Sequence, residues 1–162
     1  MVDDEIMKNP LNIDLSNLKI EQLGYVFKDV EKQAKIMEIV YGIPKFTILE
    51  VNDLHIKYRG KDSIILQKIA FSRLFNMQIE LIEQVKGDCI YKEFLDAGKE
   101  GFQHVSFFIE ELDYYIDAFQ KAGFNIIHYG QIGKQRFAYF DTEETFGLLF
   151  EFQETVKRKK KK

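Results

Sequence analysis

An internal repeat constrains the fold of this chain more than any other feature. The stretch QLGYVF that begins at Gln22 and the stretch HVSFFI that begins at His104 read as the same β-strand written twice, and each is followed by a helix that ends near a glycine. Gln22 and His104 are 82 residues apart, and so are Asp29 and Glu111, which precede the two helices. The shared offset favours a duplication of one strand–helix–strands unit, and neither copy would bury a complete core alone.

Periodicity and turn residues define the expected elements. The first copy should hold a strand at 20–27, a helix between Asp29 and Gly42, and strands at 46–51, 54–59, 64–71 and 75–83. The second should hold a strand at 104–109, a helix at 111–122, and strands at 124–129, 135–140 and 147–153, with a short helix at 90–97 between the copies. We therefore divide the chain into an irregular lead-in (1–19), a first module (20–86), a linker with a short helix (87–100), a second module (101–154) and a basic tail (155–162).

Composition limits the class of protein. With 162 residues, of which 46% are hydrophobic, the chain can form one domain or two small modules that share a core. No apolar run approaches the roughly 20 residues of a membrane span, and the N-terminus lacks the features of a secretory signal. A single cysteine, Cys89, excludes an internal disulfide and fits a cytoplasmic location, and we expect it to be a structural thiol. The net charge is −3, although residues 157–162 (KRKKKK) are all basic, and we interpret them as a solvated tail.

The repeat pairs four polar residues. Gln22 and His104 lie at the starts of equivalent strands, whereas Glu80 and Glu151 lie near the ends of the closing strands, each between two large apolar neighbours. Because successive side chains of a strand alternate in direction, each glutamate should point opposite to those neighbours, into a curved sheet or cleft. An unpaired buried carboxylate is unfavourable, and a divalent cation would offset that cost.

These residue types also define the kind of metal. One imidazole, two carboxylates and one amide oxygen fit Zn²⁺, Mn²⁺, Co²⁺, Ni²⁺ or Fe²⁺ better than a thiolate-selective metal. Four ligands on an octahedral ion leave two positions open, which is typical of a catalytic site. Taken singly, the residues have plainer interpretations: His104 as a hydrogen-bonded core histidine, and Glu80 and Glu151 as solvent-facing strand residues.

At this point the chain resembles the vicinal oxygen chelate superfamily, which includes glyoxalase I, methylmalonyl-CoA epimerase, extradiol dioxygenases and bleomycin-resistance proteins. The segments that carry the resemblance are QLGYVFKDVEKQAKIMEIVYGI (22–43), MQIELIE (77–83), GFQHVSFFIEELDYYIDAFQKAGF (101–124) and FAYFDTEETFGLLFEFQE (137–154). It implies an α+β fold of two tandem βαβββ modules that form a U-shaped sheet around a metal-binding cleft. The four metal-ligand positions of the family fall on Gln22, Glu80, His104 and Glu151, a set similar to that of glyoxalase I of the eukaryotic type. The rest of the sequence is more similar to epimerase-like members.

The resemblance implies a metal-dependent isomerase, epimerase or lyase that moves a proton next to a carbonyl. The substrate would be an acyl-CoA or a thiol adduct of a 2-oxoaldehyde. Glu151 is the expected base and Glu80 the second choice, while His104 anchors the ion and Gln22 is a neutral ligand that keeps it electrophilic. The expected partners are this small molecule and a second copy of the chain in a homodimer, with neither nucleic acid nor membrane.

One departure from the epimerases leaves alternatives open. Those enzymes carry a second acid on the third strand of the first module, but here that strand reads IILQKIAF (64–71), with Leu66 or Gln67 near the expected place and Lys68 as a possible substitute. A non-catalytic binding or sequestration protein therefore stays an alternative. A dioxygenase is disfavoured because its usual ligands are two histidines and one glutamate. Weaker cleft candidates are Tyr58, Arg59, Lys68, Arg136 and Tyr139, and we expect His55 and His128 at the surface or behind a ligand.

Overall fold

The structure is a computed structural model that describes residues 14–157. Most of the expected lead-in (1–13) and most of the basic tail (158–162) lie outside the described residues. Along the chain the elements are a 3₁₀ turn η1 (Leu15–Asn17), β1 (Gln22–Val26), α1 (Val30–Tyr41), β2 (Thr47–Tyr58), β3 (Lys61–Leu74), β4 (Met77–Lys86), α2 (Ile90–Asp96), β5 (Gly101–Phe108), α3 (Leu112–Lys121), β6 (Ile126–Ile132), β7 (Gln135–Phe140), α4 (Glu143–Phe146) and β8 (Leu149–Thr155).

The strands form one mixed sheet that closes into a barrel in the order β1-β4-β3-β2-β6-β7-β8-β5. The expected α+β class is confirmed, but the sheet is a closed barrel rather than an open U. Closure depends on a short antiparallel pairing of β2 with β6, in which Ile56 lies opposite Gly130. Glycine is needed there because a Cβ at Gly130 would lie 2.8 Å from the Phe137 ring and 3.0 Å from Ile56.

The ends of α1 follow from its sequence. Asp29 caps the N-terminus, where its side chain accepts a hydrogen bond from the backbone N–H of Lys32, and Gly42 ends the helix in the left-handed region (φ 65°). The expected helix between Asp29 and Gly42 is therefore confirmed. The separate strands expected at 46–51 and 54–59 form the single strand β2, whose pairing with β3 is interrupted at Asp53, a residue with φ 49°. A bulge of this kind bends a strand without ending it.

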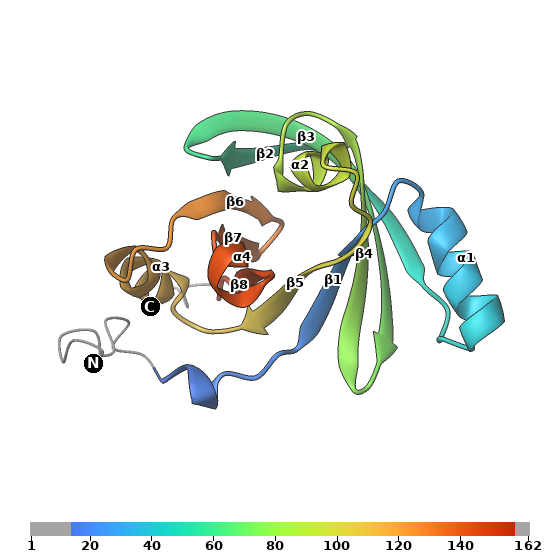
Figure 1. The fold of residues 1–162 in the computed structure, drawn as a ribbon, viewed down its shortest axis with the longest axis horizontal. Helices are drawn as coiled ribbons and strands as arrows, with labels where there is room; N and C mark the ends of the chain where they lie inside the picture. Colours follow the sequence, from blue (N-terminus) through green and yellow to red (C-terminus); the bar gives the residue numbers. More distant parts are fainter. Residues whose placement is uncertain (1–13, 158–162) are drawn as a thin grey trace, which may run out of the picture.

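The helices divide the apolar residues into three clusters. Figure 1 shows α1 on the outer side of β4, α3 at the opposite end of the molecule and α2 beneath the arch of β2 and β3. Under α1, Val30 and Ala34 pack against Ala70, Ile79 and Leu81. A second cluster joins α3 to β5, β7 and β8 and consists mostly of large aromatic residues and small partners: Val105, Phe107, Leu112, Phe119, Ala138, Phe140 and Phe152. The third cluster connects α2 with the inward side of the barrel, which the site also uses.

In residues 14–157, no helix is long and apolar enough to span a membrane.

Candidate metal centre

Four adjacent strands carry the four residues of the expected site. β1 and β5 are neighbours in the barrel, with β4 on the far side of β1 and β8 on the far side of β5. Gly24 of β1 lies opposite both Glu80 and His104, while Ser106 of β5 lies opposite both Gln22 and Glu151. The four candidate ligands therefore lie in two neighbouring rows across these strands: Glu80 and His104 flank Gly24, and Gln22 and Glu151 flank Ser106.

The structure brings three of these side chains together and buries them. His104 Nε2 lies 3.4 Å from Glu80 Oε2 and 3.6 Å from Glu151 Oε2, and one ligand atom from each residue lies within 4.8 Å of the others. The exposed fractions are 0% for His104, 7% for Glu80 and 4% for Glu151. The solvent-facing interpretation of the two glutamates is therefore wrong.

A hydrogen bond at Nδ1 of His104 leaves Nε2 as the ring nitrogen that could bind a metal. Its Nδ1 lies 3.1 Å from Gln103 Oε1, an acceptor that favours the tautomer with the proton on Nδ1. Burial lowers the pKa of His104, although the nearby Glu151 opposes this shift. With the proton on Nδ1, Nε2 carries the lone pair of the ring, and it is the nitrogen that lies close to both carboxylates.

Gly24 makes room for this ring. A Cβ at Gly24 would lie 1.9 Å from both Cε1 and Nε2 of His104. Any side chain at this position would displace the imidazole, so the glycine inside the strand is a requirement of the site. The sequence contains this signal, because Gly24 lies on the same strand face as Gln22, but its reason is visible only once β1 and β5 are paired.

The two carboxylates lack a compensating charge. Burial raises the pKa of Glu80 to about 8. Burial also raises the pKa of Glu151 to about 7. The nearby His104 and the hydrogen bonds with Ser106 and Gln153 lower this pKa but do not cancel the effect of burial. A divalent cation would balance the charge of these carboxylates and favour their ionised form, and O and N donors suit Zn²⁺ or its first-row neighbours. The residues present therefore fit the expected metal.

Gln22 is connected to the site through Gln153, a residue that the sequence analysis missed. Gln153 Nε2 lies 2.9 Å from Gln22 Oε1, 2.9 Å from Ser106 Oγ and 2.8 Å from Glu151 Oε2. The other end of the Gln22 amide donates to Gln78 Oε1 at 2.6 Å. Gln153 thus connects two candidate metal ligands, Gln22 and Glu151, through hydrogen bonds from one amide nitrogen. Its signal in the sequence is its position two residues after Glu151, on the same face of β8.

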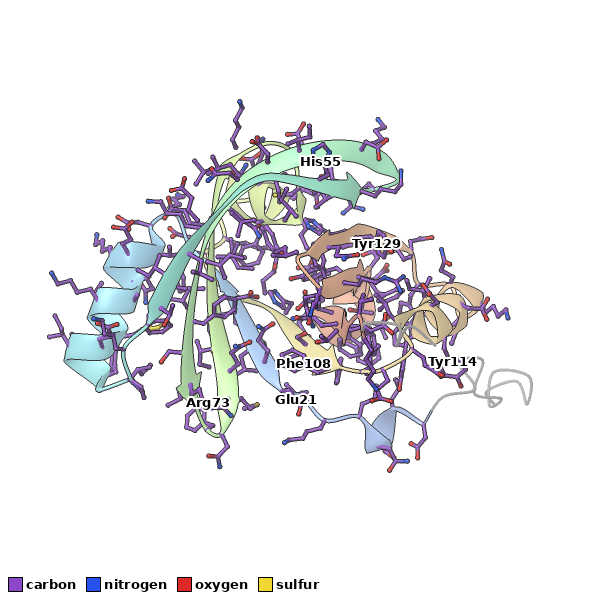
Figure 2. The ribbon with its side chains drawn as sticks, turned by 180° about the vertical axis from the view of Figure 1, so that it is seen from behind. Glu21, His55, Arg73, Phe108, Tyr114 and Tyr129 are labelled. Carbon is purple, nitrogen blue, oxygen red and sulfur yellow. The ribbon has the colours of Figure 1, made fainter. Side chains whose placement is uncertain are left out.

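A cavity of about 910 Å³ opens beside these residues. Gln22, Glu80 and Glu151 line it, whereas His104 lies behind them. Its walls are mostly apolar, and Phe108, at the end of β5 in Figure 2, is one of them. A small molecule could thus contact the carboxylates while the rest of it lies against hydrocarbon, which is the usual character of a ligand site.

Two of the five weaker candidates line the cavity, and three do not. Arg136 lies at its edge, paired with Asp113 and Glu154, and Tyr139 lies deeper, beside Glu151. The other three form ion pairs or hydrogen bonds elsewhere: Tyr58 and Arg59 with Glu93, and Lys68 with Glu31.

The third strand of the first module brings an amide to the cavity instead of an acid. Gln67 of β3 lines the cavity, and its Oε1 is buried without a hydrogen-bond partner among the described residues. Lys68 Nζ lies 3.0 Å from Glu31 Oε1 of α1, so its side chain is on the other face of β3. Lys68 is therefore not a substitute base.

The remaining histidines and the cysteine differ in burial, and none of them lines the cavity. His55 is exposed on the outer side of β2, as Figure 2 shows. His128 is 1% exposed and lies among the rings of Tyr91, Phe137 and Tyr139, so a surface position for it is wrong. Neither of its ring nitrogens has a hydrogen-bond partner among the described residues. Cys89 is fully buried, and burial raises the pKa of its thiol to about 11.

The fold and this arrangement agree with the family to which the chain belongs. Residues 21–140 match the model of the Glyoxalase/Bleomycin resistance protein/Dioxygenase superfamily, so the chain is a member of this superfamily. The match contains Gln22, Glu80 and His104, whereas Glu151 lies beyond its end. A search of curated proteins finds no match.

Solved structures share the fold at low sequence identity. A hypothetical protein from Bacillus halodurans is 20% identical, with 90% of this chain and 99% of that chain covered and a TM-score of 0.61. A variant of methylmalonyl-CoA epimerase from Streptomyces coelicolor, in complex with 2-nitronate-propionyl-CoA, is 14% identical, with 89% and 99% covered and a TM-score of 0.64. Methylmalonyl-CoA epimerase from Mycobacterium tuberculosis is 15% identical, with 91% and 96% covered and a TM-score of 0.60.

Proposed function

We propose that this protein is a divalent-metal-dependent isomerase, epimerase or lyase that moves a proton on the carbon next to a carbonyl. The substrate would be an acyl-CoA or a thiol adduct of a 2-oxoaldehyde. The observation that carries the proposal is the buried Glu80–His104–Glu151 group at the wall of a largely apolar cavity. Membership of the superfamily and the shared fold with methylmalonyl-CoA epimerases support it.

The ligands of the metal would be Gln22, Glu80, His104 and Glu151. A bound divalent cation supplies positive charge that stabilises an oxygen of the substrate as negative charge develops on it. His104 contributes a neutral nitrogen with its second nitrogen held by Gln103. Gln22 contributes an uncharged oxygen, so the ligand set carries only the two negative charges of the glutamates.

Glu151 would take the proton from the carbon and return it. Its carboxylate lines the cavity, and the 2.8 Å contact with Gln153 Nε2 orients one of its oxygens. Glu80 is the second candidate for this role, since it lines the same cavity. A single base that serves one face of the substrate suffices for isomerisation by a proton shuttle.

A non-catalytic binding or sequestration protein is the alternative. It is favoured by Gln67, because an amide cannot serve as the second base of a two-base epimerisation where it faces the cavity. Such a protein would bind its ligand without exchanging a proton of that ligand with solvent.

Proton exchange tests the proposal directly. The purified protein, loaded with each candidate metal, is incubated in D₂O with a panel of acyl-CoAs and of hemithioacetals, and deuterium at the carbon is followed by NMR. We expect exchange with at least one substrate, loss of exchange in Glu151→Gln at unchanged fold, and normal exchange in Glu50→Gln, a matched control on the exposed side of β2. Binding of these compounds without exchange in wild type would favour sequestration.

Three further expectations belong to this proposal. The first module would span 20–86, the linker 87–100 and the second module 101–154, and limited proteolysis of the linker would test these bounds. The chain would form a homodimer, which sedimentation measures. It would act in the cytoplasm, which fractionation of the source cells tests.

A further inference from the structure

Two buried tyrosines stand beside the candidate metal centre. Tyr139 of β7 is 1% exposed and Tyr91 of α2 is 3% exposed, and both line the cavity. The two hydroxyl groups are 2.9 Å apart, and the Tyr139 hydroxyl lies 3.5 Å from His104 Nε2. Tyr139 is also the cross-strand neighbour of Glu151. A pair of hydroxyls thus faces both the ligands and the space in which a small molecule would bind.

The hydrogens of this group form one directional chain when no metal is bound. In the His104 tautomer with the proton on Nδ1, the Tyr91 O–H donates to the Tyr139 oxygen, the Tyr139 O–H is directed to His104 Nε2, and His104 Nδ1–H donates to Gln103 Oε1. Each donor has an acceptor in this arrangement. The chain ends at Nε2, the nitrogen that the proposed function assigns to the metal.

Metal and hydroxyl cannot share that nitrogen. An imidazole nitrogen has a single lone pair, so a cation on Nε2 removes the acceptor of the tyrosine pair. The pair then has two O–H groups and only one acceptor between them, in whichever direction the bond between Tyr91 and Tyr139 points. These hydroxyls form no other hydrogen bond with the described residues, and a buried donor without an acceptor is unfavourable.

We propose that Tyr139, held in place by Tyr91, donates a hydrogen bond to the substrate oxygen on which negative charge develops. This proposal rests on the proposed function and assigns a further catalytic residue to the same site. Tyr139 touches the substrate, and Tyr91 is a positioning residue that fixes the direction of the Tyr139 hydroxyl. The arrangement couples the two events, because metal binding at His104 releases the Tyr139 hydroxyl for the substrate.

The experiment uses acetohydroxamate, a small chelator whose oxygen becomes negative when it binds a metal. The dissociation constants for Co²⁺ and then for acetohydroxamate on the Co²⁺-loaded protein are measured by calorimetry. Wild type is compared with Tyr139→Phe, Tyr91→Phe and the matched control Tyr129→Phe. Tyr129 does not line the cavity, although its hydroxyl contacts Arg136 at the cavity edge. These measurements do not depend on the identity of the natural substrate.

In Tyr139→Phe we expect acetohydroxamate to bind roughly ten- to hundredfold more weakly, the usual effect of removing a hydrogen bond to a charged group. Co²⁺ should bind equally well or more tightly, since the hydroxyl no longer competes for His104 Nε2. Tyr91→Phe should have a smaller effect on acetohydroxamate, and Tyr129→Phe none. With an exchanging substrate, Tyr139→Phe should lower kcat by about 10²–10³ and leave KM nearly unchanged.

The outcomes separate this proposal from the function on which it rests. If wild type binds Co²⁺ and acetohydroxamate and Tyr139→Phe binds acetohydroxamate as tightly, the role of Tyr139 is refuted and the metal site stands. If Tyr139→Phe loses Co²⁺ binding as well, Tyr139 only supports the structure of the site, and the proposal is again refuted. If wild type binds no divalent metal, the proposed function and this inference both fail.

Discussion

Replacing Glu80 by glutamine should stabilise the metal-free protein and remove its response to metal. Burial raises the pKa of Glu80 from 4.5 to about 8, so the folded state holds this proton more tightly than the unfolded chain does. Stability then falls as the pH rises from the ordinary pKa to the raised one, because ionisation is easier in the unfolded chain. A glutamine side chain does not ionise, so the variant should not lose stability through this group as the pH rises.

The size of the effect follows from the same shift. A rise from 4.5 to about 8 corresponds to at most roughly 5 kcal/mol of stability above pH 8. Relaxation around a buried charge reduces such effects, so we expect about 2–4 kcal/mol, or roughly 4–16 °C in Tm for a chain of this size. Near pH 5 the wild-type carboxyl is mostly protonated when folded, and the two proteins should have similar Tm values.

Thermal unfolding at pH 5, 7 and 8.5 measures this difference, first with a chelator and then with excess divalent metal. The chelated variant should be more stable than wild type at pH 8.5, and metal should raise the Tm of wild type only. Glu50→Gln, on the exposed side of β2, should behave as wild type. Equal stability of the chelated proteins at pH 8.5, or a metal response that survives in the variant, would refute the reasoning.

Three further predictions follow from the site and its surroundings. Gly24→Ala should fold but lose metal affinity by at least about tenfold, since its Cβ would displace the His104 ring; Gly123→Ala, strained but with free space, should lose only stability, as chemical denaturation would show. Gln153→Leu should weaken metal binding roughly 10–100-fold in a calorimetric titration, because it unties two ligand places; unchanged affinity would contradict that role. The thiol of Cys89 should resist a disulfide reagent at pH 8 until the protein unfolds, and fast labelling of folded protein would disprove its burial.

The part of the fold that local sequence determines was predictable. The bounds of α1 come from its own capping residues, Asp29 and Gly42, and the positions of the four candidate ligands come from the alternation of side chains along strands. The offset between the two copies placed Gln22 and His104 in equivalent strands, and the structure pairs these strands, with Gln22 opposite Ser106 and Gly24 opposite His104.

Features that depend on contacts between distant segments were not predictable. Closure of the barrel depends on Gly130, whose small size matters only because Ile56 and Phe137 approach it. The bond between Tyr91 and Tyr139 joins α2 to β7, and no spacing in the sequence indicates it. The short helix α4 (Glu143–Phe146) was also missed, because a single turn has no periodicity to detect.

The central claim is that Gln22, Glu80, His104 and Glu151 hold a divalent metal ion. A crystal structure of the Co²⁺-loaded protein, with diffraction data above and below the cobalt absorption edge, tests it most directly. The account predicts one anomalous peak per chain within coordination distance of His104 Nε2 and of a carboxylate oxygen of each glutamate. The absence of a peak there, or a peak only at other residues, would contradict the account.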